Sequence, residues 1–151
     1  MNTDEISNLR FTRSRLKQEG HFEEAIPYQL QILEHAKTCG RIKELANAWN
    51  YLSVLYLNVA RYEDAESAAR AALTTFKNEP DPSDETIACY ELVLSRILAA
   101  QKRFNEAVLF GNAAIKHYSV FHDPPDDFLL SVQKDVDSMT AWRDQQSTNA
   151  G

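Results

Sequence analysis

The side chains that could support chemistry in this sequence do not fall into a recognisable site. The chain contains four histidines, His21, His35, His117 and His122. No two of them are four residues apart, the spacing that puts two metal ligands on one face of a helix, and no HExxH segment is present. The two cysteines, Cys39 and Cys89, form no CxxC pair, and we identify no histidine at ligand spacing from either. We therefore expect free thiols in a reducing compartment, no metal ion and no cofactor.

Catalytic motifs are also missing from the sequence. There is no G-x-S-x-G segment, no P-loop and no other glycine-rich phosphate loop. Two acid pairs, Glu23/Glu24 and Asp126/Asp127, are adjacent in the chain, so on a helix their side chains would point about 100° apart. They would not face each other across a substrate, as paired carboxylates in acid–base catalysis do. We expect no catalytic residues and a protein that is not an enzyme.

The composition is that of a single globular domain that binds neither nucleic acid nor membrane. The 151 residues include 16 basic and 22 acidic side chains, which gives a net charge of −6. An acidic balance disfavours binding to nucleic acid, which depends on a basic face. The first thirty residues hold no signal-peptide pattern, and no apolar run approaches the roughly 20 residues of a membrane span. These features predict a cytoplasmic location.

An internal repeat organises the elements that would position a binding surface. Three segments align without gaps, at 16–25, 56–65 and 98–107. Each contains an aromatic residue, then two residues of which at least one is acidic, then an alanine: Phe22 and Ala25, Tyr62 and Ala65, Phe104 and Ala107. The alanines are 40 and 42 residues apart, a period that is typical of helical solenoids. The aromatic residue would begin a second helix, and the alanine would mark the closest approach of two helices.

Apolar residues spaced three and four apart predict helices on both sides of each segment. The expected helices are 4–19, 22–37, 43–59, 62–77, 84–101, 104–120 and 125–144. They form three helix pairs, at about 4–37, 43–77 and 84–120, followed by a capping helix at about 125–144, in one domain of residues 1–144. Asp123 to Asp126 would open the capping helix, and residues 145–151 would form a flexible tail.

At this point the chain resembles the tetratricopeptide repeat family. The middle unit matches the family pattern in type and spacing at Trp49, Leu52, Tyr56, Tyr62, Ala65, Ala72 and Leu73. The first unit departs from it at Thr12 and at Arg13, where the family prefers a small residue. The period exceeds the usual 34 residues and in this is similar to kinesin light chains and bacterial peptide-sensing regulators. The resemblance implies an all-α, right-handed TPR-like superhelix with three helix pairs and a C-terminal capping helix.

The resemblance also implies a partner-binding groove lined by the first helix of each pair. Its positions in this chain are Arg10, Phe11, Lys17, Asn47, Asn50, Tyr51, Val54, Leu92 and Arg96. Basic residues but no acids occupy these positions, so we expect Arg10, Lys17 and Arg96 to make the groove locally positive. The alternative is that the polar members are solvated helix residues and that Phe11 and Tyr51 pack on neighbours. The heat-shock carboxylate clamp is largely missing, because Ser14, Tyr51, Cys89 and Val93 occupy four of its five positions.

These observations predict a protein–protein interaction module or adaptor that binds a partner peptide or helix in its groove. Two alternatives stay open. One is a small acidic secretion-type chaperone that holds a client protein. The other is a structural subunit of a larger assembly, which an exposed apolar row around Leu92, Val93 and Phe128 would favour. The sequence leaves homo-oligomerisation undecided.

Overall fold

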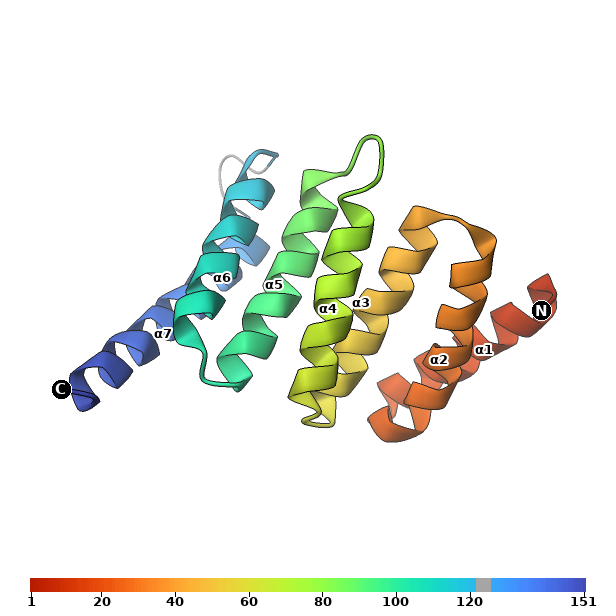
Figure 1. Ribbon diagram of the computed structural model, residues 1–151, viewed down its shortest axis with the longest axis horizontal. Helices are drawn as coiled ribbons and strands as arrows, with labels where there is room; N and C mark the ends of the chain where they lie inside the picture. Colours follow the sequence, from red (N-terminus) through yellow and green to blue (C-terminus); the bar gives the residue numbers. More distant parts are fainter. Residues whose placement is uncertain (122–125) are drawn as a thin grey trace. The chain divides into compact units, whose positions relative to one another are not determined.

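The computed structural model describes residues 1–121 and 126–151, and its described residues form two compact units, Met1–Pro80 and Asp81–Gly151. The first unit contains α1 (Thr3–Gln18), α2 (Phe22–Cys39), α3 (Ile42–Asn58) and α4 (Tyr62–Phe76). The second contains α5 (Asp84–Ala100), α6 (Phe104–Ser119) and α7 (Asp127–Asn149). Figure 1 shows these helices, coloured along the sequence. Throughout the described ranges the regular structure is helical, which confirms the all-α prediction.

Helices α1 to α6 begin and end within two residues of the expected positions, and they pack as three pairs. The expected start of the capping helix at 125, together with His122 and Asp123, lies outside the described residues. Ser83 caps α5 by accepting a hydrogen bond from the Thr86 backbone N–H at 3.4 Å. Among the helices of the described chain, none combines the length and the apolar character that crossing a membrane requires.

The turn between the two helices of each pair has the same structure three times. Each turn contains one residue with a left-handed backbone: Gly20 (φ 81°), Ala60 (φ 59°) and Lys102 (φ 60°). The next residue donates its backbone N–H to a carbonyl at the end of the first helix: His21 to Leu16, Arg61 to Tyr56 and Arg103 to Leu98, at 2.8 to 2.9 Å. This is the hydrogen bond that closes a Schellman-type helix end, so one local geometry sets the reversal in every pair.

The second helix of each pair starts with a basic side chain that reaches an acid three residues later. The pairs are His21–Glu24 at 2.9 Å, Arg61–Asp64 at 2.8 Å and Arg103–Glu106 at 2.8 Å. No side chain caps the backbone at these starts in the usual way. The acids lie in the first helical turn, where a negative charge favours the helix dipole. The three pairs therefore share this contact between a basic and an acidic side chain as well as their apolar pattern.

The three alanines of the repeat are completely buried, as the spacing predicted. Ala25, Ala65 and Ala107 each have 0% of their surface exposed. In the first unit the surrounding core contains Leu16, Leu33, Leu52 and Leu55, with Trp49 and Tyr56 packed against it. Interiors are close-packed, so the small side chains set how near the paired helices come.

Helix α7 packs on α6 and buries four of its residues, Leu129, Val132, Val136 and Met139. Two aromatic members of its expected apolar stripe, Phe128 and Trp142, are partly exposed. Helix α7 continues to Asn149, beyond the expected end of the capping helix at about 144. Gln146 donates to the carbonyl of Lys102 at 3.2 Å, which ties this last stretch to the turn before α6. A contact 44 residues away in sequence could not be read from the polar composition of the tail.

Candidate partner-binding site in the first unit

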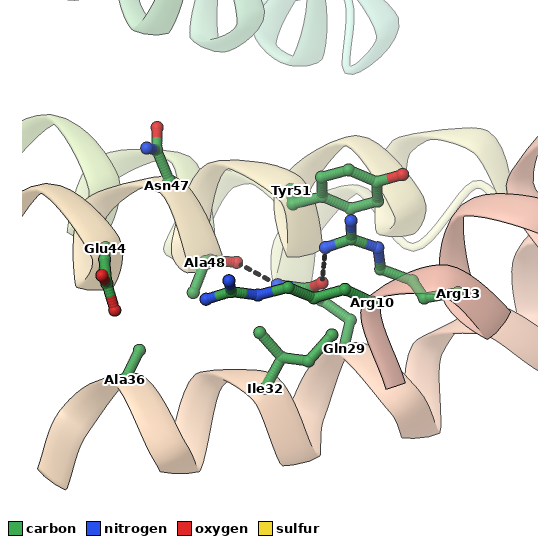
Figure 2. Close-up of a pocket in the computed structure, with 9 residues that line it drawn as sticks. All are labelled: Arg10, Arg13, Gln29, Ile32, Ala36, Glu44, Asn47, Ala48 and Tyr51. Carbon is green, nitrogen blue, oxygen red and sulfur yellow. Dashed lines mark hydrogen bonds between the residues drawn. The ribbon is translucent and has the colours of Figure 1, made fainter. Parts of the chain in front are cut away.

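A cavity of about 310 Å³ opens between α1, α2 and α3. It is lined by Arg10, Arg13, Gln29, Ile32, Ala36, Glu44, Asn47, Ala48 and Tyr51, which Figure 2 shows as sticks. Three of the residues expected in a groove, Arg10, Asn47 and Tyr51, therefore lie around one cavity. Three polar residues that were not expected in the groove, Arg13, Gln29 and Glu44, also line it.

Gln29 holds the three helices of the site together. Its side chain is fully buried, and its Nε2 donates to the carbonyl oxygen of Ala48 on α3 at 2.8 Å. Its Oε1 accepts a hydrogen bond from Nη1 of Arg13 on α1, also at 2.8 Å. A buried amide that is bonded on both sides rigidifies its surroundings, whereas an unpaired one is costly. The sequence does indicate this role, because Gln29 is a polar residue on the buried stripe of α2 between Ile26 and Leu33.

The guanidinium of Arg13 lies over the ring of Tyr51. The guanidinium carbon is 3.6 Å from the centre of the Tyr51 ring, and Nη2 donates to Ser14 Oγ at 3.1 Å. Burial lowers the pKa of the Arg13 guanidinium, and the charge of Arg10 adds to this, while Tyr51 opposes it. An arginine nevertheless stays protonated in proteins. Arg13 thus stands where the repeat family prefers a small residue, and its long side chain contacts Gln29 and Tyr51.

Lys17 brings a further positive charge to the same ring. Its Nζ lies 4.8 Å from the centre of Tyr51. Arg10, Arg13 and Lys17 have no acidic partner within 4.0 Å among the residues that the structure describes. Six other basic side chains of the first unit do have one: Arg15, Lys37, Arg41, Lys43, Arg61 and Arg70. The uncompensated positive charge of this unit is therefore gathered around Tyr51 and its cavity.

The remaining expected groove residues of the first unit are placed less uniformly. Asn50 on α3 is half-buried, and its Oδ1 is buried without a hydrogen-bond partner in the described part of the chain. Val54 is half-buried. Phe11 is 71% exposed and does not line the cavity. Buried acceptors without a partner are uncommon, and this one does not line the cavity.

In the second unit, the structure corrects the expectation for Leu92. This residue is only 4% exposed and forms a core cluster with Ala88, Ala114 and Val132. Since Val132 belongs to α7, the capping helix covers Leu92 and leaves it unavailable to a partner. An exposed row of Leu92, Val93 and Phe128 is therefore not present.

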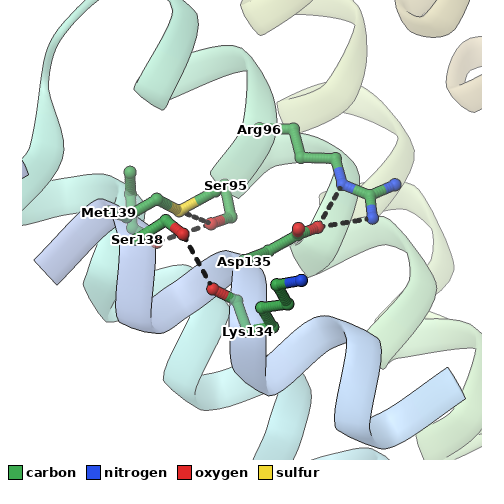
Figure 3. Close-up of polar contacts among 7 residues, drawn as sticks. Ser95, Arg96, Lys134, Asp135, Ser138 and Met139 are labelled. Atoms are coloured by element: carbon green, nitrogen blue, oxygen red, sulfur yellow. Dashed lines mark hydrogen bonds and ion pairs between the residues drawn. The ribbon is translucent and has the colours of Figure 1, made fainter. Parts of the chain in front are cut away.

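Helix α7 also compensates the positive charge of Arg96. Its Nη2 lies 2.7 Å and its Nε 3.2 Å from Oδ2 of Asp135. Figure 3 shows these two contacts as dashed lines. The prediction that Arg96 adds free positive charge is wrong for this reason. Nearby, Ser95 Oγ donates to the carbonyl of Ala107 at 2.6 Å, and Met139 Sδ lies 3.3 Å from Ser95 Oγ. These contacts fix the register of α7 against α5.

The cysteines and histidines form one close pair that the sequence reasoning overlooked. His35 and Cys39 are four residues apart on α2, and Nε2 of His35 lies 3.3 Å from Sγ of Cys39. No group of three or more His, Cys, Asp or Glu side chains suited to a metal occurs in the described ranges. Both cysteines are free. Burial raises the pKa of the Cys89 thiol, and Glu85 adds to the effect, so its reactive thiolate is disfavoured.

No protein-family model matches this chain, and no curated protein matches it by sequence. Among solved structures it is similar to the crystal structure of BtubC (BKLC) from P. vanneervenii, with a TM-score of 0.71 at 15% sequence identity. The match covers 95% of this chain and 62% of that one, so the chain spans less than two thirds of its structural neighbour. At this identity the similarity concerns the fold, and it supports a helical-repeat architecture.

Proposed function

We propose that this protein is an interaction module that binds a segment of a partner protein on the α1–α3 side of its first unit. The observation that carries the proposal is the group of three basic side chains without acidic partners in the described chain, Arg10, Arg13 and Lys17, beside a cavity. The chain as a whole has a net charge of −6, so a positive site of this kind runs against its overall balance. Such a site favours a partner segment that is acidic.

The chemistry of the wall supports binding rather than catalysis. Glu44 is the one carboxylate among the residues that line the cavity, and its Oε1 is held by Arg41 Nη1 at 2.6 Å. Arginine cannot serve as a proton acceptor at physiological pH. Asn47 at the cavity offers an amide group of the kind that pairs with an extended backbone. Charge would then select the segment, and the amide would hold its main chain.

The test is the affinity for the native partner, obtained by pull-down from the host and measured by fluorescence anisotropy. We expect the double reversal Arg10→Glu, Lys17→Glu to weaken binding at least about tenfold, and wild-type binding to weaken with salt. The matched control is Arg15→Glu, Lys37→Glu, which changes the net charge equally at two cations that already have acidic partners. Circular dichroism verifies folding. Equal effects of the two double variants would reject the site.

The structural-subunit alternative is supported by a different observation. Three large apolar side chains of α7 are partly exposed: Phe128, Leu130 and Trp142. Exposed apolar groups of this size are enriched at protein interfaces. If this alternative holds, Trp142→Ser and not the charge reversals would release the partner. The same pull-down therefore decides between the two surfaces.

A further inference from the structure

We propose that the group recognised beside Tyr51 is a phosphate monoester, carried by a phosphorylated serine or threonine of the partner segment. This inference rests on the proposed function and specifies the chemistry of its ligand.

The three cations form one row on α1. Arg10, Arg13 and Lys17 follow each other at intervals of three and four residues, which places them on one face of the helix. The charged ends of two of them meet at a single ring, since the Arg13 guanidinium carbon and the Lys17 Nζ lie 3.6 and 4.8 Å from the centre of Tyr51. Arg10 lines the adjoining cavity, and its charge acts on the Arg13 guanidinium. Like charges held this close repel each other, so the free site is electrostatically unfavourable until an anion binds.

One carboxylate would compensate only one of these charges. A phosphate monoester carries about −1.5 to −2 charges at neutral pH and three strong acceptor oxygens. It can therefore accept hydrogen bonds from an arginine fork and attract the compact ammonium group of a lysine at the same time. The combination of two arginines with a lysine matches this ligand better than it matches a glutamate side chain.

Arg13 is fixed in place before any ligand arrives. Its guanidinium is held by Gln29 and Ser14 and rests on Tyr51, so little side-chain freedom remains to be lost on binding. A guanidinium has five N–H donors, and these two hydrogen bonds use only two of them. The Nε of Arg13 is buried, so its N–H is closed to a ligand. The N–H groups that remain for an anion are those on Nη1 and Nη2 that these two hydrogen bonds do not use, on a group that is already oriented.

The opposite end of the cavity limits where the anion can bind. Figure 2 shows Glu44 at the end away from Arg13, with Asn47 on the same helix, α3. The carboxylate of Glu44 would repel a phosphate, which leaves the end formed by Arg13 and Tyr51. The cavity of about 310 Å³ gives room for a phosphorylated side chain rather than only for an ion.

The experiment follows the side-chain N–H signal of Arg13 by NMR while small anions are added at constant ionic strength. The probes are O-phosphoserine, glutamate and a pentapeptide with a central phosphoserine between alanines. We expect phosphoserine to shift the Arg13 signal saturably and to bind at least about fivefold more tightly than glutamate. The peptide should bind more tightly than the free amino acid, because it adds main-chain contacts to Asn47.

Variants with retained folding test the assignment of the charges. Arg10→Gln and Lys17→Gln should each weaken phosphoserine binding several-fold, whereas Arg15→Gln, at a cation that already pairs with Glu19, should not. Arg13 itself is left intact, because its removal would strand the buried Gln29. Equal affinity for phosphoserine and glutamate, or no shift of Arg13 by either, would overturn the phosphate inference and leave the partner assay to judge the proposed function. Equal affinity for the peptide and for free phosphoserine would assign the site to a small phosphorylated molecule instead.

Discussion

Gly111 on α6 faces Val136 on α7 so closely that a Cβ atom on the glycine would lie 2.5 Å from Cγ2 of the valine. The same Cβ would lie 3.1 Å from Oγ of Ser95 on α5. Valine is stiff in a helix and cannot rotate its methyl group away without cost. The absent side chain at position 111 therefore allows three helices of the second unit to meet, and it places α7 over Leu92.

The first prediction is that Gly111→Ala destabilises the protein. Alanine would raise helix propensity by about 1 kcal/mol, but overpacking of this kind typically costs about 1–3 kcal/mol. The free energy of unfolding from urea titration should fall, while Asn112→Ala, at the exposed neighbouring position, should leave it unchanged or raise it. Val136→Ala should restore part of the loss in the double variant. A clear stabilisation by Gly111→Ala would show that α7 is not packed in this way.

A second prediction uses the repeated turn. Ala60 and Lys102 adopt the left-handed backbone that Gly20 adopts in the first pair, and this conformation costs non-glycine residues roughly 1–2 kcal/mol. Ala60→Gly and Lys102→Gly should therefore each raise the free energy of unfolding by about 0.5–1 kcal/mol. The control is Ala141→Gly on the exposed side of α7, which should lower it by about 1 kcal/mol. Destabilisation at all three positions would mean that the two turns are not strained.

The third prediction concerns the closest approach of α3 and α4. Ala65 is fully buried, so Ala65→Leu should destabilise by about 1–3 kcal/mol and lower the thermal midpoint clearly. Glu66 is unsuitable as a control because it pairs with Arg70 at 2.9 Å. Ser67 is exposed on the same helix, and Ser67→Leu should have little effect. Similar midpoints for the two variants would show that the register of α4 is wrong.

A fourth prediction concerns alkaline pH. Burial raises the pKa of Tyr90 to about 12, above its ordinary value of 10.0. Because the folded state holds this proton more tightly, the stabilisation is fully present below pH 10 and is lost as the pH rises towards 12. The unfolding free energy should fall by an amount on the order of 1–2 kcal/mol across this window. Tyr90→Phe should remove that part of the pH dependence, measured by urea titration at pH 9 and above, and an unchanged slope would contradict the burial of this hydroxyl.

The sequence by itself was sufficient for the helices and their pairing. Helix periodicity and the aromatic–acid–alanine segment are local patterns, and each recurs three times, so the bounds of α1 to α6 followed to within two residues. The buried alanines followed for the same reason. Arg10, Asn47 and Tyr51 were expected at a common surface from the resemblance to the repeat family, and they line one cavity.

Only the tertiary structure decided which charges remain free. Arg13 meets Gln29 across 16 residues of sequence, and Arg96 meets Asp135 across 39. Periodicity assigns a residue to a face of its own helix, but it does not say which side chain of another helix will lie opposite. That depends on how closely the helices pack, which small residues such as Gly111 determine. For this reason Arg13, which departs from the family pattern in the sequence, lies at the centre of the site. Helix α7 buries Leu92 and pairs Arg96 with Asp135, so neither residue belongs to the site.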